Sequence, residues 1–160
     1  MHETRIDIPA KSRAKVVETL NARLADALDL ALQSKQAHWN VKGPNFIALH
    51  ELFDKVAEAF EGSVDEIAER ITALGGTAYG TVGAIARNTS LAPYPEDIYD
   101  GTAHVEALAN AIATFGKKIR KSAEVAEKAG DNGTEDLLVG ISQEADKYLW
   151  FLEAHVQGKR

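Results

Sequence analysis

Residues 35–54 have the sequence KQAHWNVKGPNFIALHELFD, in which a short helix-breaking segment, Asn40–Pro44, separates two stretches of helical periodicity. Before it, over about Lys11–Trp39, apolar residues recur every three or four positions with no internal Gly or Pro. After it, a second helix is predicted over residues 44–74, with the proline in its opening turn and Gly75 at its end. Two long helices joined by so short a loop must lie antiparallel.

The rest of the chain repeats this pattern after a long connection. Residues 76–100 contain several Gly and Pro residues and no sustained period, which predicts a crossover with one short helical turn around Pro95–Tyr99. A third helix is predicted over Thr102–Lys128, and a fourth is capped by Thr134 and ends near His155. The order favours an all-α fold, a four-helix bundle of ferritin-like connectivity with the crossover between the second and third long helices.

Composition limits the domain count and the class of protein. The 160 residues, 45% of them apolar, suit a single domain over residues 1–160 with short tails at 1–10 and 157–160. With 18 Lys+Arg against 24 Asp+Glu, the net charge of −6 disfavours a strongly basic nucleic-acid module. The absence of cysteine excludes thiolate metal sites and disulfides. The chain shows neither a secretory leader nor an apolar run of about 18 residues, so we expect a cytoplasmic protein without membrane spans.

The second helix carries a polar stripe. At about 100° per residue, His50, Asp54, Asp65 and Glu69 fall within about 100° of one another, and His38 ends the preceding helix beside them. One interpretation is an ordinary solvated face, because any amphipathic helix turns such a stripe to water. The other is a metal site, because imidazole and carboxylate together suit a divalent ion such as iron.

Spacing along the helix restricts the metal interpretation. Asp54 and Asp65 are eleven residues apart, or about 16 Å along the axis, so one ion cannot contact both ends of the stripe. A two-fold axis would set His50 and Asp54 of one subunit against Asp65 and Glu69 of another. A di-iron centre inside each bundle would need Glu-x-x-His pairs. The residues three positions before the histidines do not provide them: Lys35, Ile47, Gly101 and Leu152.

Four motifs together resemble the Dps family, the mini-ferritins named as DNA-binding proteins from starved cells. The motifs are Lys35-Gln-Ala-His-Trp-Asn40, His50-x3-Asp54, Asp65-x3-Glu69-Arg70 and Asp146-Lys-Tyr-Leu-Trp-Phe-Leu-Glu153. The resemblance covers about Arg13–His155. It implies a hollow homo-dodecamer that oxidises Fe(II) to Fe(III), preferably with hydrogen peroxide, and stores ferric oxide, protecting the cell from oxidative damage.

The resemblance also assigns residues. It implies a ferroxidase site at the two-fold interface, with His38, His50 and Asp54 from one subunit and Asp65 and Glu69 from its partner. Trp39 is implied as a nearby electron donor, and packing at a subunit interface is the alternative. The remaining assignments concern residues outside the ferroxidase site. Asp131 and Asp136 match an acidic iron-entry pore, and the alternative is that they are exposed carboxylates at the start of a helix. Trp150 is expected in the core or at an interface. His104 and His155 are expected at the surface.

The family name also implies DNA binding, from which this sequence departs. Residues 1–15 carry only Arg5, Lys11, Arg13 and Lys15 as basic side chains, and Lys159 and Arg160 end the chain. We therefore expect weak or absent DNA binding, with a nucleoid-associated, DNA-protecting shell as the alternative function. Zinc is a further candidate at the site, as a competitor, because it binds such nitrogen and oxygen ligands more tightly than Fe(II). A dimer or partial assembly is the alternative to a closed shell.

Overall fold

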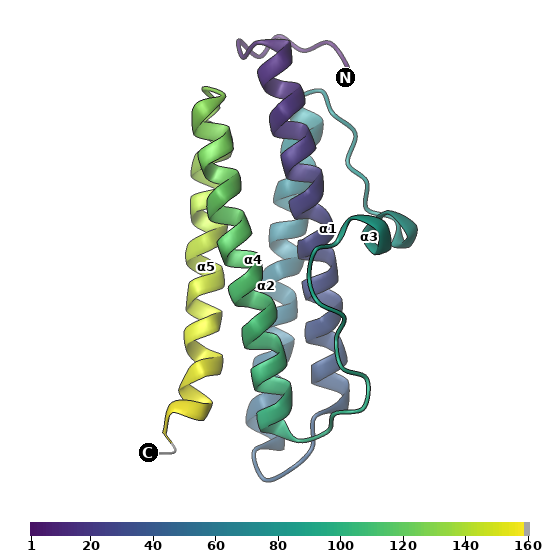
Figure 1. Cartoon of the computed structure of the whole chain (residues 1–160), viewed down its shortest axis with the longest axis vertical. Coiled ribbons are helices and arrows are strands. Elements are labelled where there is room, and N and C mark those ends of the chain that lie inside the picture. The colour runs from purple at the N-terminus through teal and green to yellow at the C-terminus, as the bar shows by residue number, and fades with distance from the viewer. Residues whose placement is uncertain (159–160) are drawn as a thin grey trace.

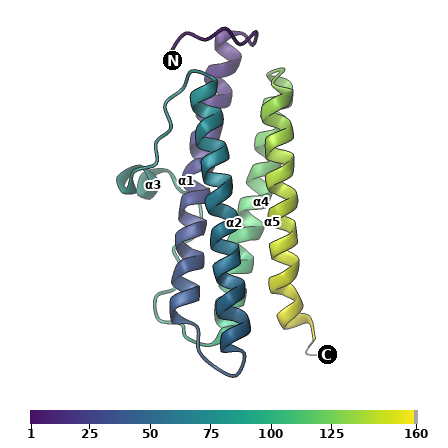
Figure 2. The same cartoon turned by 180° about the vertical axis from the view of Figure 1, so that it is seen from behind.

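The computed structural model describes residues 1–158, which form five helices. They are α1 (Ala10–Asn40), α2 (Phe46–Ala73), α3 (Val82–Asn88), α4 (Gly101–Lys128) and α5 (Asn132–Gln157). Figures 1 and 2 show the four long helices side by side, with α3 outside the bundle against α1. The predicted ferritin-like four-helix bundle with a long crossover is confirmed. None of these helices has the length and apolar character of a membrane span. The predicted 157–160 tail lies partly outside the described residues.

The core forms where the apolar stripes of the long helices meet. The buried apolar side chains of α2, except the small Ala57 beside His50, lie on the side away from the polar stripe, as the periodicity predicts. They are Leu49, Phe53, Val56, Ala57, Phe60, Ile67 and Ile71. Phe60 meets Phe115 of α4 edge to face, with ring centroids 5.4 Å apart. Each such side chain stabilises the fold by about 1.5–3 kcal/mol through its removal from water.

The crossover contains a short helix at a different place from the predicted one. The turn expected at Pro95–Tyr99 is wrong: those residues are not helical, and α3 lies at Val82–Asn88 instead. Two prolines near Tyr94 disfavour helical backbone there. In α3 the buried Ala84 compensates for the unfavourable Gly83 as the helix packs against α1.

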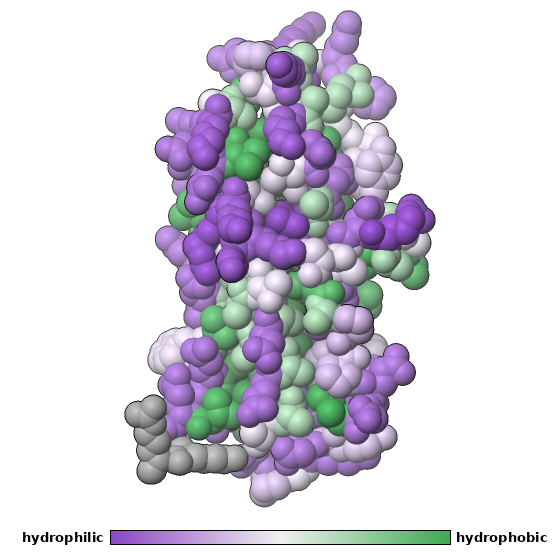
Figure 3. Space-filling model, viewed as in Figure 1, coloured by the Kyte–Doolittle hydropathy of each residue, from purple (hydrophilic) through white to green (hydrophobic). Residues whose placement is uncertain are grey.

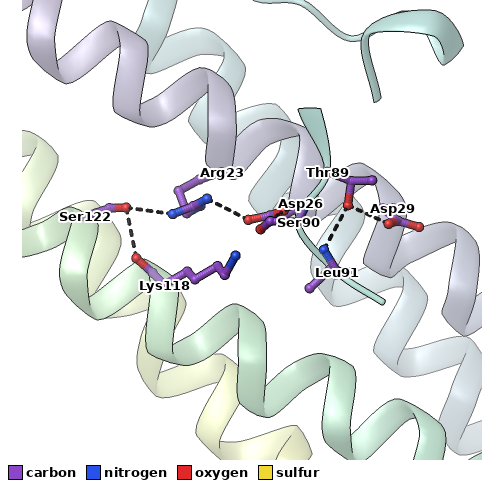
Figure 4. Close-up of polar contacts among 8 residues, drawn as sticks. All are labelled: Arg23, Asp26, Asp29, Thr89, Ser90, Leu91, Lys118 and Ser122. Atoms are coloured by element: carbon purple, nitrogen blue, oxygen red, sulfur yellow. Dashed lines mark hydrogen bonds and ion pairs between the residues drawn. The ribbon is translucent and has the colours of Figure 1, made fainter. Parts of the chain in front are cut away.

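A network of polar side chains fixes the crossover to α1. Asp26, whose side chain is fully buried, accepts hydrogen bonds from the backbone N–H and the hydroxyl of Ser90, both at 2.7 Å. Arg23 forms an ion pair with the same carboxylate at 2.8 Å. One turn further along α1, Asp29 accepts a 2.6 Å hydrogen bond from the hydroxyl of Thr89 (Figure 4). The crossover is thereby held against the bundle at a defined register.

Several predictions about single residues are corrected by the structure. His104, expected at the surface, is 1% exposed, because the start of α4 packs beneath the crossover. His155 is exposed, as predicted. Trp150 is 62% exposed and so does not lie in the core of this chain. Thr134 does not cap α5; the carboxylate of Asp131 does so, accepting the Thr134 N–H at 3.0 Å.

We expect Asp26→Asn to lower the free energy of unfolding by about 3 kcal/mol, because it leaves Arg23 without its buried counter-charge. The measurement is the midpoint of chemical unfolding. Glu18→Gln is the matched control: its pair with Lys15 is exposed, and its loss should cost less than about 1 kcal/mol. Equal losses in the two variants would contradict a stabilising role for the Asp26 network.

Candidate metal centre

His38 and His50 form a stacked pair where α1 ends and α2 begins. Their ring centroids are 3.7 Å apart with an interplanar angle of 20°. The Nδ1 atom of His38 lies 2.7 Å from the carbonyl oxygen of His50, and the Nδ1 atom of His50 lies 2.8 Å from the carbonyl oxygen of His38. Because a carbonyl oxygen only accepts, each Nδ1 carries the hydrogen. In the neutral imidazole this hydrogen bond leaves the lone pair on Nε2, the tautomer in which a histidine binds a metal through that atom.

The turn between α1 and α2 produces this arrangement. Gly43 has a φ of 114°, a backbone conformation open to glycine and strained for other residues. The N–H of Lys42 donates to the carbonyl of Tyr99 at 2.9 Å, so the crossover also holds the turn. The carbonyl of His38 belongs to the last turn of α1, where helix carbonyls lack partners within the helix, and it is therefore free to accept from His50.

Asp54 adds a carboxylate one turn after His50. Its Oδ1 lies 3.9 Å from the Nδ1 of His38 and forms an ion pair with Lys35. The hydrogen bond from Lys35 lowers the pKa of Asp54 and raises that of Lys35, so both side chains are charged at neutral pH. The side chain of Asp54 is 35% exposed, which leaves it accessible to a cation.

Asp65 and Glu69 lie further along α2 and are not brought to this cluster. Both are exposed, and neither carboxylate forms an ion pair within residues 1–158. The same residues contain no group of three or more His, Asp or Glu side chains placed to hold one metal ion. A single chain thus joins His38, His50 and Asp54, while the other two predicted ligands remain apart.

Exposed apolar side chains surround the histidine pair on α1 and α2. Trp39 is 68% exposed and Ile47 61%, and Leu32 and Phe46 are also exposed. Such a concentration of large apolar side chains is unusual for a solvent-facing surface and is typical of a protein interface. The surface beside the half-site therefore suits contact with another chain.

The two pore candidates differ in their surroundings. Asp131, expected as an exposed carboxylate, is 1% exposed; it accepts a 2.6 Å hydrogen bond from Arg70 and caps α5. Asp136, one turn into α5, is exposed as expected. Sequence reasoning missed the Arg70–Asp131 pair, which joins the end of α2 to the start of α5, because no local pattern connects residues 61 positions apart.

Comparisons with known proteins show the family to which the chain belongs. The chain matches the ferritin-like domain over residues 17–160. It is 46% identical to the DNA protection during starvation protein of Agrobacterium fabrum, with 99% of this chain and 98% of the relative covered. It is 38% identical to the protein of that name from Mycolicibacterium smegmatis, covering 96% of this chain and 85% of the relative.

Solved structures extend the likeness to three dimensions. A tetragonal form of Dps from Mycobacterium smegmatis matches with a TM-score of 0.90 and 36% identity, covering 96% of this chain and 93% of that one. Dps from Vibrio cholerae O1, described as a member of a broad superfamily of ferritin-like diiron-carboxylate proteins, matches with a TM-score of 0.91 and 25% identity over 98% of both chains. The chain belongs to the ferritin-like family, and within it to the Dps proteins.

Proposed function

We propose that this protein is a ferroxidase that oxidises Fe(II) with hydrogen peroxide and stores the ferric product inside a homo-oligomeric shell. The observation that carries the proposal is the half-site on each chain. His38 and His50 bind each other's carbonyls through Nδ1, which leaves each Nε2 for a metal, and Asp54 lies near His38, while Asp65 and Glu69 are not grouped with them in one chain.

A second copy of the chain would complete the centre. If two α2 helices pack antiparallel about a two-fold axis, Asp65 and Glu69 of one subunit lie opposite the histidine pair of the other, giving two equivalent sites per dimer. The same contact would cover the exposed Trp39 and Ile47. We take the full assembly to be a dodecamer, with a mass of about 208 kDa for twelve chains of 17.3 kDa.

The ligand set suits the proposed chemistry of its iron substrate. Imidazole nitrogens bind Fe(II), and the three carboxylates neutralise charge and favour Fe(III) once it forms. Hydrogen peroxide accepts two electrons and two protons to give two molecules of water, so two Fe(II) ions consume one peroxide without releasing a hydroxyl radical. Zinc would occupy the same ligands without redox chemistry and act as a competitor.

Iron entry and electron supply are further parts of the proposal. Asp136 exposes its carboxylate at the start of α5 and could line an entry pore between subunits. Asp131 would add its negative charge to the pore only from a buried position, because Arg70 binds its carboxylate. Trp39 follows His38 directly and suits both roles expected of it, electron donor and interface contact.

DNA protection through direct binding is the second candidate function, suggested by the names of the relatives. The N-terminal segment disfavours it. The N–H of His2 donates to the carbonyl of Gly75, and Arg13 donates to the carbonyls of Ile8 and Leu74, so the segment lies against the bundle instead of extending as a basic arm. We infer protection through iron chemistry in the cytoplasm, with nucleoid association at most weak.

The net charge of the chain also disfavours DNA binding, although one face of the molecule is locally basic. Figure 3 shows hydrophilic side chains over the N-terminal half of α1 and the C-terminal half of α4. The exposed charged residues on these segments are mainly basic: Lys11, Lys15, Lys117, Arg120, Lys121 and Lys128, against Glu18, Glu124 and Glu127. The chain as a whole nevertheless carries −6, a charge that opposes the approach of a polyanion.

We expect anaerobically loaded Fe(II) to be oxidised rapidly by stoichiometric hydrogen peroxide and slowly by air, as followed by ferric absorbance. Asp65→Asn combined with Glu69→Gln should abolish the rapid phase by removing two ligand charges. Glu66→Gln, at an exposed position on the same helix, is the matched control and should retain it. Rapid oxidation in the double variant would contradict the assigned ligands.

Mixed assemblies test whether the centre is shared between chains. A chain with His50→Ala and Asp54→Asn lacks one half of each site, and a chain with Asp65→Asn and Glu69→Gln lacks the other. Each variant alone should be inactive, whereas co-expression should restore activity, because a mixed dimer contains one site built from two unaltered halves. No restoration in purified mixed assemblies would exclude a shared centre.

We expect Lys35→Gln to tighten Zn(II) binding severalfold, because the ammonium of Lys35 competes with the metal for the carboxylate of Asp54. Zn(II) is redox-inert, so calorimetric titration measures the affinity directly. Lys15→Gln, which disrupts an exposed pair remote from the site, serves as control. An unchanged or weaker affinity in Lys35→Gln would show that the ion pair does not oppose binding.

We expect no gel shift of duplex DNA at about 150 mM salt, where the Debye length of about 8 Å screens isolated surface lysines. Deleting residues 1–9 should leave this result unchanged, because that segment is docked and carries little positive charge. A clear shift with the full chain that disappears on deletion would establish a DNA-binding arm and overturn our inference.

A further inference from the structure

A half-buried tyrosine and a buried histidine outside the metal centre form a hydrogen-bonded pair. The hydroxyl oxygen of Tyr94, in the crossover, lies 2.6 Å from the Nδ1 atom of His104, in the first turn of α4. Their rings are nearly parallel, with an interplanar angle of 17°. The distance lies within the range in which a positioned side chain transfers a proton. Nothing in the proposed iron chemistry uses this pair.

The surroundings keep both partners neutral. Burial lowers the pKa of His104, although the Ile98 carbonyl and Asp100 act in the opposite direction, so the imidazole is unprotonated at pH 7 and can accept a proton. Burial raises the pKa of Tyr94, so the phenol keeps its proton. A phenol becomes a strong acid when it loses an electron, and a low-dielectric site disfavours the resulting charge. Oxidation of Tyr94 therefore requires a base within hydrogen-bond reach, and His104 supplies it.

The other three tyrosines lack such a base. The ammonium of Lys42 lies 4.6 Å from the ring centroid of Tyr99. The ammonium of Lys147 lies 4.6 Å from the ring centroid of Tyr148. A cation over the ring opposes removal of an electron. Tyr79 is 57% exposed. None of these three hydroxyls is hydrogen-bonded to a histidine within residues 1–158.

A groove on the surface brings Tyr94 and Trp39 together. Tyr94 and Trp39 line the same groove, together with Leu32, Gln33 and Pro93. Trp39 directly follows His38 in α1. Trp39 thus shares a groove with Tyr94 and is bonded through the backbone to a candidate iron ligand, which makes it the aromatic side chain suited to pass an electron between them.

We propose that Tyr94 is a one-electron donor that quenches hydroxyl radical formed when a single Fe(II) reacts with peroxide, with His104 as its proton acceptor and Trp39 as the intermediate carrier. The hydroxyl radical takes one electron from Trp39 and becomes hydroxide. Tyr94 returns the electron to oxidised Trp39 while its phenolic proton passes to Nδ1 of His104. A later Fe(II) supplies one electron to the tyrosyl radical, and His104 returns the proton. This assignment rests on the proposed iron chemistry for its oxidant.

The first experiment tests the pair without iron. The metal-free protein is oxidised by a light flash with ruthenium tris-bipyridine and persulfate and then frozen for electron paramagnetic resonance. A persistent tyrosyl signal is expected in the unaltered protein and in Tyr99→Phe, and its loss is expected in Tyr94→Phe. His104→Gln retains a hydrogen-bond acceptor but no base, so it should also lose the signal. The same signal in Tyr94→Phe or in His104→Gln would overturn the proposal.

The second experiment adds Fe(II) and hydrogen peroxide and measures escaping hydroxyl radical with a spin trap. Tyr94→Phe should release more radical than Tyr99→Phe while oxidising iron at the same rate, and Trp39→Phe should lower the tyrosyl yield. Equal radical release from Tyr94→Phe and Tyr99→Phe would contradict the quenching role. If the unaltered protein does not oxidise iron, the proposed function fails, but the flash experiment still decides whether Tyr94 and His104 act as a donor pair.

Discussion

The antiparallel contact between α1 and α2 is the constraint on which the rest of this structure depends. A turn of five residues, with Gly43 in a backbone conformation suited to glycine, leaves the two helices no other arrangement. The contact places the last turn of α1 beside the first turn of α2, so His38 and His50 can exchange hydrogen bonds with each other's carbonyls. Those bonds fix both imidazole tautomers before any metal arrives, and the site requires little reorganisation.

The main features of the fold were predictable because short stretches of sequence specify them. Apolar residues at helical spacing and breakers at Gly43 and Gly75 define the long helices to within a few residues. The position of α3 was not predictable, because its stability comes from packing Ala84 against α1 and not from its own sequence, which contains Gly83. Local signals identify helices well only where tertiary contacts do not override them.

The candidate metal ligands show the same division between local and long-range information. Helical spacing was sufficient to group His50 with Asp54 and to separate them from Asp65 and Glu69. It could not reveal that Lys35 forms an ion pair with Asp54, or that Arg70 holds Asp131 in a buried position, because these partners are 19 and 61 residues apart. His104 was misjudged for a similar reason: its burial depends on how the crossover folds over the start of α4.

The division of the ligands between the two ends of α2 has a consequence for the life of the protein in the cell. On the proposed arrangement, a newly made chain carries only part of a centre and cannot begin iron chemistry alone. Activity then arises with the subunit contact itself, so in dilute protein it would vary with the square of chain concentration. Ferric product would form only where subunits are assembling into the shell. The length of α2, which keeps the two half-sites of one chain apart, would prevent mineral from forming on unassembled chains.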